Sequence, residues 1–149
     1  MVGSLARRTL QKLRSRIYCP YIAAFGEAGV TAAFLVDVVG QGGAVSPDVV
    51  SGRLRITKTE LAHALGLSRD SVSKASRVAS PATQKRLRDM VEIVNRVIPW
   101  TGSELAAFAW YRSQPLPSFG DQTAEDLVHA GRGEAVKRYL SRLAEGGFA

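Results

Sequence analysis

The sequence is poor in residues that could build a disulfide framework or a metal site. It holds one cysteine, Cys19, and two histidines, His63 and His129, in 149 residues. One cysteine cannot form an internal disulfide, and these three residues are too few for a zinc site of four Cys and His ligands. We therefore expect no cofactor and no bound metal, and we interpret Cys19 as a small apolar residue.

Long apolar runs and an export signal are also missing. No segment approaches the length of a membrane span, and the first residues lack an apolar stretch followed by a cleavage site. The hydrophobic content of 46% is still enough for one core or two small ones. We therefore expect a small globular protein in the cytoplasm, without a membrane partner.

The patterns of known catalytic sites are absent as well. The sequence has no nucleophile elbow, no paired carboxylates with a histidine and no cluster of metal ligands. The glycines within residues 40–43 lack the spacing of a dinucleotide-binding loop because position 45 is Val45, and they lack the lysine and hydroxyl of a P-loop. We expect a connector at 40–43 and no enzyme.

Acidic residues are fewer than basic ones, and the difference is concentrated in one part of the chain. The net charge is +7, and residues 53–100 hold ten Lys or Arg against four acids, whereas residues 101–149 are nearly neutral. Basic side chains that neutralise phosphates supply most of the non-specific affinity of proteins for DNA. The charge distribution therefore indicates a nucleic-acid-binding segment at 53–100.

Residues 56–76 have the pattern of two short helices joined at Gly66, which is the pattern of a helix-turn-helix. Leu61 and Leu65 share the buried face of the first helix. Gly66 tolerates the left-handed conformation of a tight turn, and Ser68 is a suitable N-cap for the second helix. We expect operator DNA as the partner of this segment.

The second helix divides into a buried and a polar side. Val72 and Ala75 are expected to face the core, and the polar side chains to meet base edges and phosphates. The alternative is an ordinary helical hairpin with a solvated polar face. Lys85, Arg86 and Arg88, on the next helix, are expected outside, either on phosphates or only in water. The predicted DNA-binding residues are Lys58, Ser68, Arg69, Asp70, Ser71, Ser73, Lys74 and Arg77.

Most of the remaining chain also has helical patterns, so the predicted fold is mainly α. The apolar residues 21–40 fit a buried helix or a strand, and we favour a helix, whereas residues 49–55 alternate like a short extended piece. Ser80 and Pro81 predict the start of a long helix, which Pro99 is expected to end. Three more helices follow in a small domain at residues 101–149.

The N-terminal residues 1–52 form an extension that we expect to be helical. Its first part, residues 5–17, is a cationic stripe that could touch DNA or membrane, or be a solvated arm. Because helix-turn-helix proteins usually bind two half-sites, dimerisation is our working hypothesis for this extension. The domain division is then 1–52 for the extension, 53–100 for the DNA-binding domain and 101–149 for the C-terminal domain.

Several features of the last 40 residues have the order and spacing of a known domain. They are Trp110, the loop Gln114-Pro115-Leu116-Pro117, the run Asp126-Leu127-Val128 followed by Gly131, and the ending from Leu143 to Ala149. This pattern resembles the toxin-binding domain of the Xre/MbcA/ParS antitoxins. The helix-turn-helix lies where that family has its Xre-like DNA-binding part. One departure is Leu116, where many members have Asn.

The resemblance implies an antitoxin that binds a RES-type toxin, which acts on NAD and is encoded by an adjacent gene. It also implies repression of its own operon, and we expect a homodimer. In this family the C-terminal segment covers the active site of the toxin. The alternative is a stand-alone transcriptional regulator whose C-terminal domain dimerises or senses a ligand. The implied toxin-binding residues are Trp110, Arg112, Arg132, Gly146, Gly147, Phe148 and Ala149.

Overall fold

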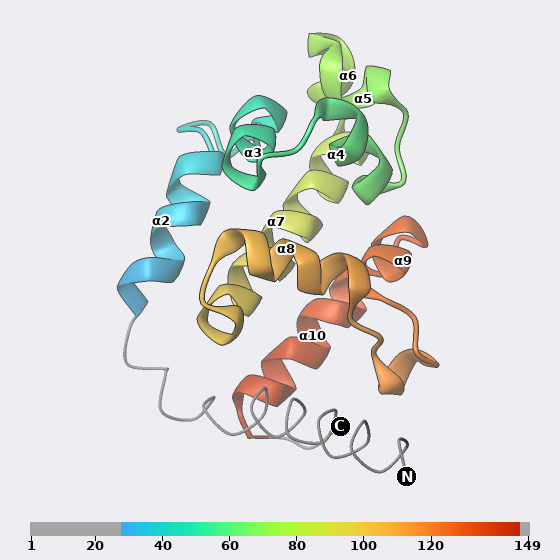
Figure 1. Ribbon diagram of the computed structural model, residues 1–149. Coiled ribbons are helices and arrows are strands. Elements are labelled where there is room, and N and C mark those ends of the chain that lie inside the picture. Colours follow the sequence, from blue (N-terminus) through green and yellow to red (C-terminus); the bar gives the residue numbers. More distant parts are fainter. Residues whose placement is uncertain (1–27, 147–149) are drawn as a thin grey trace, which may run out of the picture.

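A computed structural model describes residues 28–146 of the chain (Figure 1). Over this range the chain is built from helices. It has two isolated β-bridges and no strand longer than a bridge. The mainly α fold predicted from the sequence is confirmed. The elements are α2 (Ala28–Val38), α3 (Pro47–Leu54), α4 (Lys58–Leu65), α5 (Arg69–Ser73), α6 (Ala75–Val78), α7 (Pro81–Thr101), α8 (Glu104–Ser113), η2 (Pro117–Phe119), α9 (Ala124–His129) and α10 (Gly133–Ala144).

The long helix α7 lies at the centre, and α2, α8 and α10 pack against it (Figure 1). It begins as predicted, with Pro81 in its first turn and the Ser80 hydroxyl accepting a hydrogen bond from the Thr83 N–H at 3.3 Å. Its apolar stripe is buried, and this stripe organises the core of the molecule. The buried apolar residues of the stripe are Leu87, Met90, Val91, Ile93, Val94, Val97 and Ile98.

The predicted end of this helix at Pro99 is wrong. The helix continues to Thr101 and ends at Gly102, which has a left-handed backbone with φ 87°. Pro99 lies in the last turn, so its missing N–H removes one helical hydrogen bond without breaking the rest. The Gly102 N–H donates to Ile98 O at 2.8 Å, and the Thr101 hydroxyl donates to Val97 O at 3.1 Å.

The described part of the N-terminal extension shares this core. Phe34 and Val38 of α2 and Val50 of α3 are buried, and α2 packs along α7. The helix favoured for 21–40 is confirmed where it is described, and the glycine segment 40–43 forms a connecting turn, with the Gly43 N–H donating to Gly40 O at 2.8 Å. The expected boundary after residue 52 falls inside α3.

The extended piece expected at residues 49–55 is wrong, because these residues form most of α3. Pro47 stands in the first turn, where its fixed φ suits a helix and its missing N–H costs nothing. Arg55 ends the helix in a left-handed conformation with φ 54°, and its N–H donates to Gly52 O at 3.3 Å. In a helix of only eight residues, an alternation of apolar and polar residues cannot distinguish a helix from a strand, so the pattern was misleading.

A buried lysine joins α10 to α7. The Lys137 ammonium is 3.0 Å from Asp89 and 2.9 Å from Glu92, and it also pairs with Glu134. Burial lowers the pKa of Lys137, but the hydrogen bonds that its ammonium donates to these carboxylates raise the pKa more, so it lies above its ordinary value. Gly133 leaves room for this cluster, since a Cβ there would lie 2.6 Å from an Asp89 carboxylate oxygen.

Gly133→Ala is therefore expected to destabilise the fold by about 1–3 kcal/mol, because the added methyl displaces Asp89 from Lys137. Gly52→Ala is the matched control. Gly52 lies within α3 with nothing within 4 Å of its Cβ position, so the same change should stabilise by up to about 1 kcal/mol. Urea unfolding of both variants measures the difference, and equal effects would contradict the packing argument.

Candidate functional sites

Helices α4 and α5 have the predicted helix-turn-helix arrangement. A capping box starts α4: the Thr57 N–H donates to the Glu60 carboxylate at 2.7 Å, and the Glu60 N–H donates to the Thr57 hydroxyl at 3.2 Å. The hydrogen bonds that the Thr57 N–H and hydroxyl donate to the Glu60 carboxylate lower the pKa of Glu60. Gly66 ends α4 in the left-handed conformation with φ 65°, and Leu61 and Leu65 are buried. The turn and the buried face are those expected from the sequence.

The second helix is shorter than predicted. It breaks at Lys74, whose backbone is extended (φ −88°, ψ 123°), and the chain resumes as α6. Val72 is buried, but Ala75 is exposed, because the break removes the common face that their spacing implied. Ser68 occupies the N-cap position, yet its hydroxyl lies 2.9 Å from that of Ser71 and caps no backbone N–H.

The predicted DNA-binding residues lie along one continuous stretch from the start of α4 through α5 to α6, at one end of the molecule (Figure 1). Lys58 lies 2.7 Å from Asp48, and Lys74 lies 2.7 Å from Asp70. These are solvent-accessible pairs, which hold their partners weakly. The Lys74 ammonium lowers the pKa of Asp70. The exposed members of the stretch are Ser68, Arg69, Asp70, Ser73, Lys74 and Arg77.

Arg69 and Arg77 differ from the two lysines. Within residues 28–146, neither guanidinium makes a hydrogen bond or an ion pair with a protein group. Both are exposed and lie on either side of Asp70 and Lys74 along the stretch. Their donors are thus available to an outside acceptor, as a phosphate or a guanine edge requires.

Part of the positive charge of residues 53–100 has a structural role instead. Arg86 was expected outside, and this is wrong: its Nη1 donates to Leu65 O at 3.2 Å, to Val128 O at 2.5 Å and to His129 O at 3.0 Å. Arg88 is exposed but donates to Gly43 O at 2.6 Å. Charge counted along the sequence therefore overstates the charge that faces a ligand.

The C-terminal domain is fixed to the helix-turn-helix by a buried tyrosine. Tyr111 of α8 is fully buried, and its hydroxyl donates to Ala64 O of α4 at 2.8 Å. Burial raises the pKa of Tyr111 well above its ordinary value. Trp110, the adjacent residue, is half-buried. Of these two adjacent aromatics, Tyr111 is therefore the one that lies in the core.

The loop before α9 presents an aromatic that the sequence analysis did not single out. Leu116 is buried and anchors the loop, while Phe119 is half-buried with its ring centroid 5.7 Å from that of Tyr139. The Arg132 guanidinium lies 5.6 Å from the Phe119 ring centroid. Arg132 and Phe119 thus form one surface feature, whose only sequence signal is an aromatic between two turn-forming residues.

The predicted toxin-binding residues are spread over the domain. Trp110 and Arg112 lie on α8, and Arg132 precedes α10, whereas Gly146 follows that helix at its other end. Twelve helical residues separate these two ends of α10, a distance of about 18 Å. Arg112 and Arg132 are exposed. Gly147, Phe148 and Ala149 lie outside the described residues.

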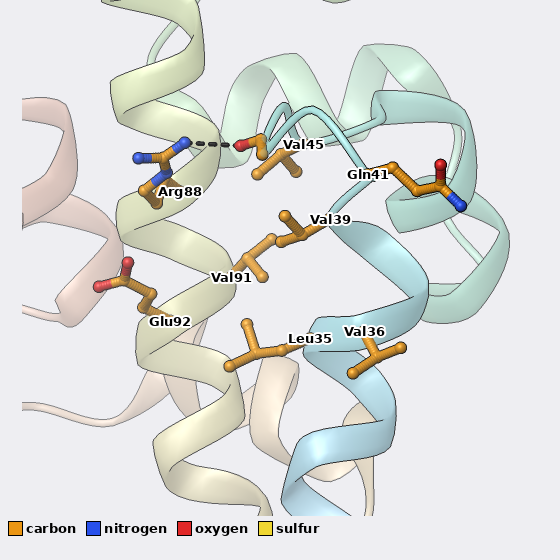
Figure 2. Close-up of a pocket in the computed structure, with 9 residues that line it drawn as sticks. Leu35, Val36, Val39, Gln41, Val45, Arg88, Val91 and Glu92 are labelled. Carbon is orange, nitrogen blue, oxygen red and sulfur yellow. Dashed lines mark hydrogen bonds between the residues drawn. The ribbon is translucent and has the colours of Figure 1, made fainter.

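An open apolar groove lies between α2 and α7 (Figure 2). Its volume is about 650 Å³, and Leu35 of α2 and Val39, the residue after that helix, face Val91 of α7 across it. Arg88 is at its rim, and its hydrogen bond to the Gly43 carbonyl closes one end. Val36 is the most exposed large apolar side chain described, at 72%.

No described helix has both the length and the apolar character needed to cross a bilayer. Over the same residues, no three His, Cys, Asp or Glu side chains are placed so that they could hold a metal ion.

Comparison with known families identifies the C-terminal domain. Residues 97–146 match the model of the antitoxin Xre/MbcA/ParS C-terminal toxin-binding domain. The match begins in the last turns of α7 and includes α8, η2, α9 and α10. No curated protein and no solved structure matches the chain. Residues 97–146 are therefore the toxin-binding domain of an antitoxin. This match supports an Xre/MbcA/ParS-type antitoxin with a role in a toxin–antitoxin system.

Arg86→Met is expected to cost about 1.5–3 kcal/mol of stability, because three backbone carbonyls lose a charged donor. Arg88→Met, the control, removes one exposed hydrogen bond and should cost less than about 1 kcal/mol. Chemical unfolding of the two variants tests this order. A larger loss from Arg88→Met would show that Arg86 does not fix the domain contact.

Proposed function

We propose that this antitoxin neutralises a RES-type toxin that acts on NAD and represses its own operon through α4 and α5. The observation that carries the proposal is the toxin-binding domain at residues 97–146, packed directly on a helix-turn-helix with an exposed polar stretch. Neither role needs catalysis by this chain. Both partners would meet it in the cytoplasm.

Support for operator binding comes from the division of α5. Its buried side is Val72, and its outer side carries Arg69 at the N-terminal end, the part of a recognition helix that reaches base edges. Lys74 and Arg77 follow at the α5–α6 break, where both are exposed, and we propose that they contact phosphates beside the groove. Because such helices usually bind two half-sites, we propose that the antitoxin acts as a homodimer.

Support for toxin binding comes from the exposed cations of the C-terminal domain. Arg112 and Arg132 each lie against an aromatic ring, at 5.7 Å from the Phe108 centroid and 5.6 Å from the Phe119 centroid. Arginines held in this way keep free donors for carboxylates of a partner. Following the family pattern, we propose that Gly147, Phe148 and Ala149 cover the active site of the toxin.

Arg69→Ala is expected to weaken operator binding by about 1–3 kcal/mol and to relax the sequence preference, if its guanidinium makes a bidentate base contact. The control is Arg138→Ala, an exposed arginine on α10, which should leave binding unchanged. Fluorescence anisotropy with the DNA upstream of its own gene and with a scrambled duplex measures both effects. An equal loss on the two duplexes would assign Arg69 to phosphate.

Lys74→Ala should behave differently, because its ammonium is placed for a phosphate. The affinity is expected to fall for all sequences alike, and the slope of log affinity against log salt should shrink by about one. Lys74 would exchange its ion pair with Asp70 for one with a phosphate. This exchange costs little free energy, because the pair with Asp70 is solvent-accessible. A titration series with an unchanged slope would remove this assignment.

Removal of the last five residues tests the neutralising segment. We expect a chain ending at Ala144 to co-purify with the product of the adjacent gene but to fail to rescue growth, whereas the full chain should do both. Equal rescue would confine neutralisation to the helical body. If neither chain binds or rescues, the protein is an ordinary DNA-binding regulator and our proposal fails.

A further inference from the structure

One buried carboxylate stands between the two proposed binding sites. Glu125 of α9 has a side chain only 9% exposed. Its Oε2 accepts a hydrogen bond from Arg112 Nε of α8 at 3.2 Å, and its Oε1 lies 3.3 Å from His63 Nδ1 of α4. Arg112 belongs to the proposed toxin surface, and His63 belongs to the first helix of the helix-turn-helix. A single side chain thus contacts both modules.

A second partner for the same carboxylate is already in place. His129 Nε2 lies 3.9 Å from Glu125 Oε1, too far for a hydrogen bond, and this nitrogen is inaccessible to solvent and has no hydrogen-bond partner. Buried polar atoms are seldom left unpaired. A movement of Glu125 of about 1 Å would pair it with His129 and withdraw it from His63. The carboxylate therefore has two discrete arrangements within reach.

The second arrangement acts on the turn of the helix-turn-helix. His129 packs directly on Gly66, where a Cβ would lie 2.9 Å from the imidazole ring. Arg86 holds the same region, since it joins Leu65 O to the carbonyls of Val128 and His129. A movement of His129 therefore displaces Gly66 as well, because the two residues are in direct contact.

We propose that Glu125 couples toxin binding to operator binding in this antitoxin, through Arg112 on one side and His63 and His129 on the other. When a toxin carboxylate pairs with Arg112, the buried Glu125 loses its cationic partner and moves from His63 to His129. This movement changes the position of α4 and of the turn that follows it. Toxin and operator then change each other's affinity by the same factor. This inference rests on the proposed function, because it needs both ligands.

The test measures the affinity of the full chain for operator DNA with and without a saturating concentration of toxin. The toxin used is the product of the adjacent gene. The probe is a duplex from the DNA upstream of its own gene. For the unaltered chain, the ratio of the two dissociation constants should differ from one by at least about fivefold. In Glu125→Gln, which keeps the shape and removes the charge, the ratio should fall to within about twofold of one. The control Arg138→Gln should keep the original ratio.

A second variant guards against a loss of folding in Glu125→Gln. His63 is 72% exposed at its side chain, so His63→Ala should fold normally and should also reduce the ratio. Unaltered coupling in both variants, or a ratio of one in the unaltered chain, would overturn the inference while leaving the proposed function intact. A chain that binds neither toxin nor operator would instead defeat the proposed function.

Discussion

The arrangement of the two modules depends on one guanidinium group. Arg86 projects from the central helix α7 and donates to three backbone carbonyls, one at the end of α4 and two at the end of α9. Carbonyls at the ends of helices lack partners within the helix, so a charged donor placed between two such ends satisfies both. Tyr111 and Glu125 add contacts to the same side of α4. The described structure is therefore a packed unit in which the domain contact is polar and specific.

This contact explains what the sequence could and could not predict. The starts of α4, α7, α8 and α9 were predictable, because a capping serine or threonine is a local signal that structure rarely overrides. The contacts of Arg86 were not predictable. An arginine on the polar side of an amphipathic helix has the same sequence pattern whether its side chain faces water or a carbonyl. The prediction that α7 ends at Pro99 was wrong for a related reason. The effect of a proline on a helix depends on how many helical hydrogen bonds remain after it.

The candidate sites show the same division. The polar stretch of α5 and the exposure of Arg112 and Arg132 were predictable from spacing and from adjacent loops. The break at Lys74 and the exposure of Ala75 were not, since the spacing of Val72 and Ala75 fits an uninterrupted helix equally well. Glu125 carried no signal at all. Its contacts with His63 and Arg112 join residues that are well separated from it in the sequence.

The close contact of His129 with Gly66 has a consequence for protein engineering. Position 66 must be glycine for the left-handed turn and also for lack of space beneath the imidazole. The turn is thus shaped for the C-terminal domain that covers it. Hybrid proteins made by joining the helices before α8 to a foreign C-terminal half would lose that fit, so exchangeable parts should be sought in residues 28–146 as a whole.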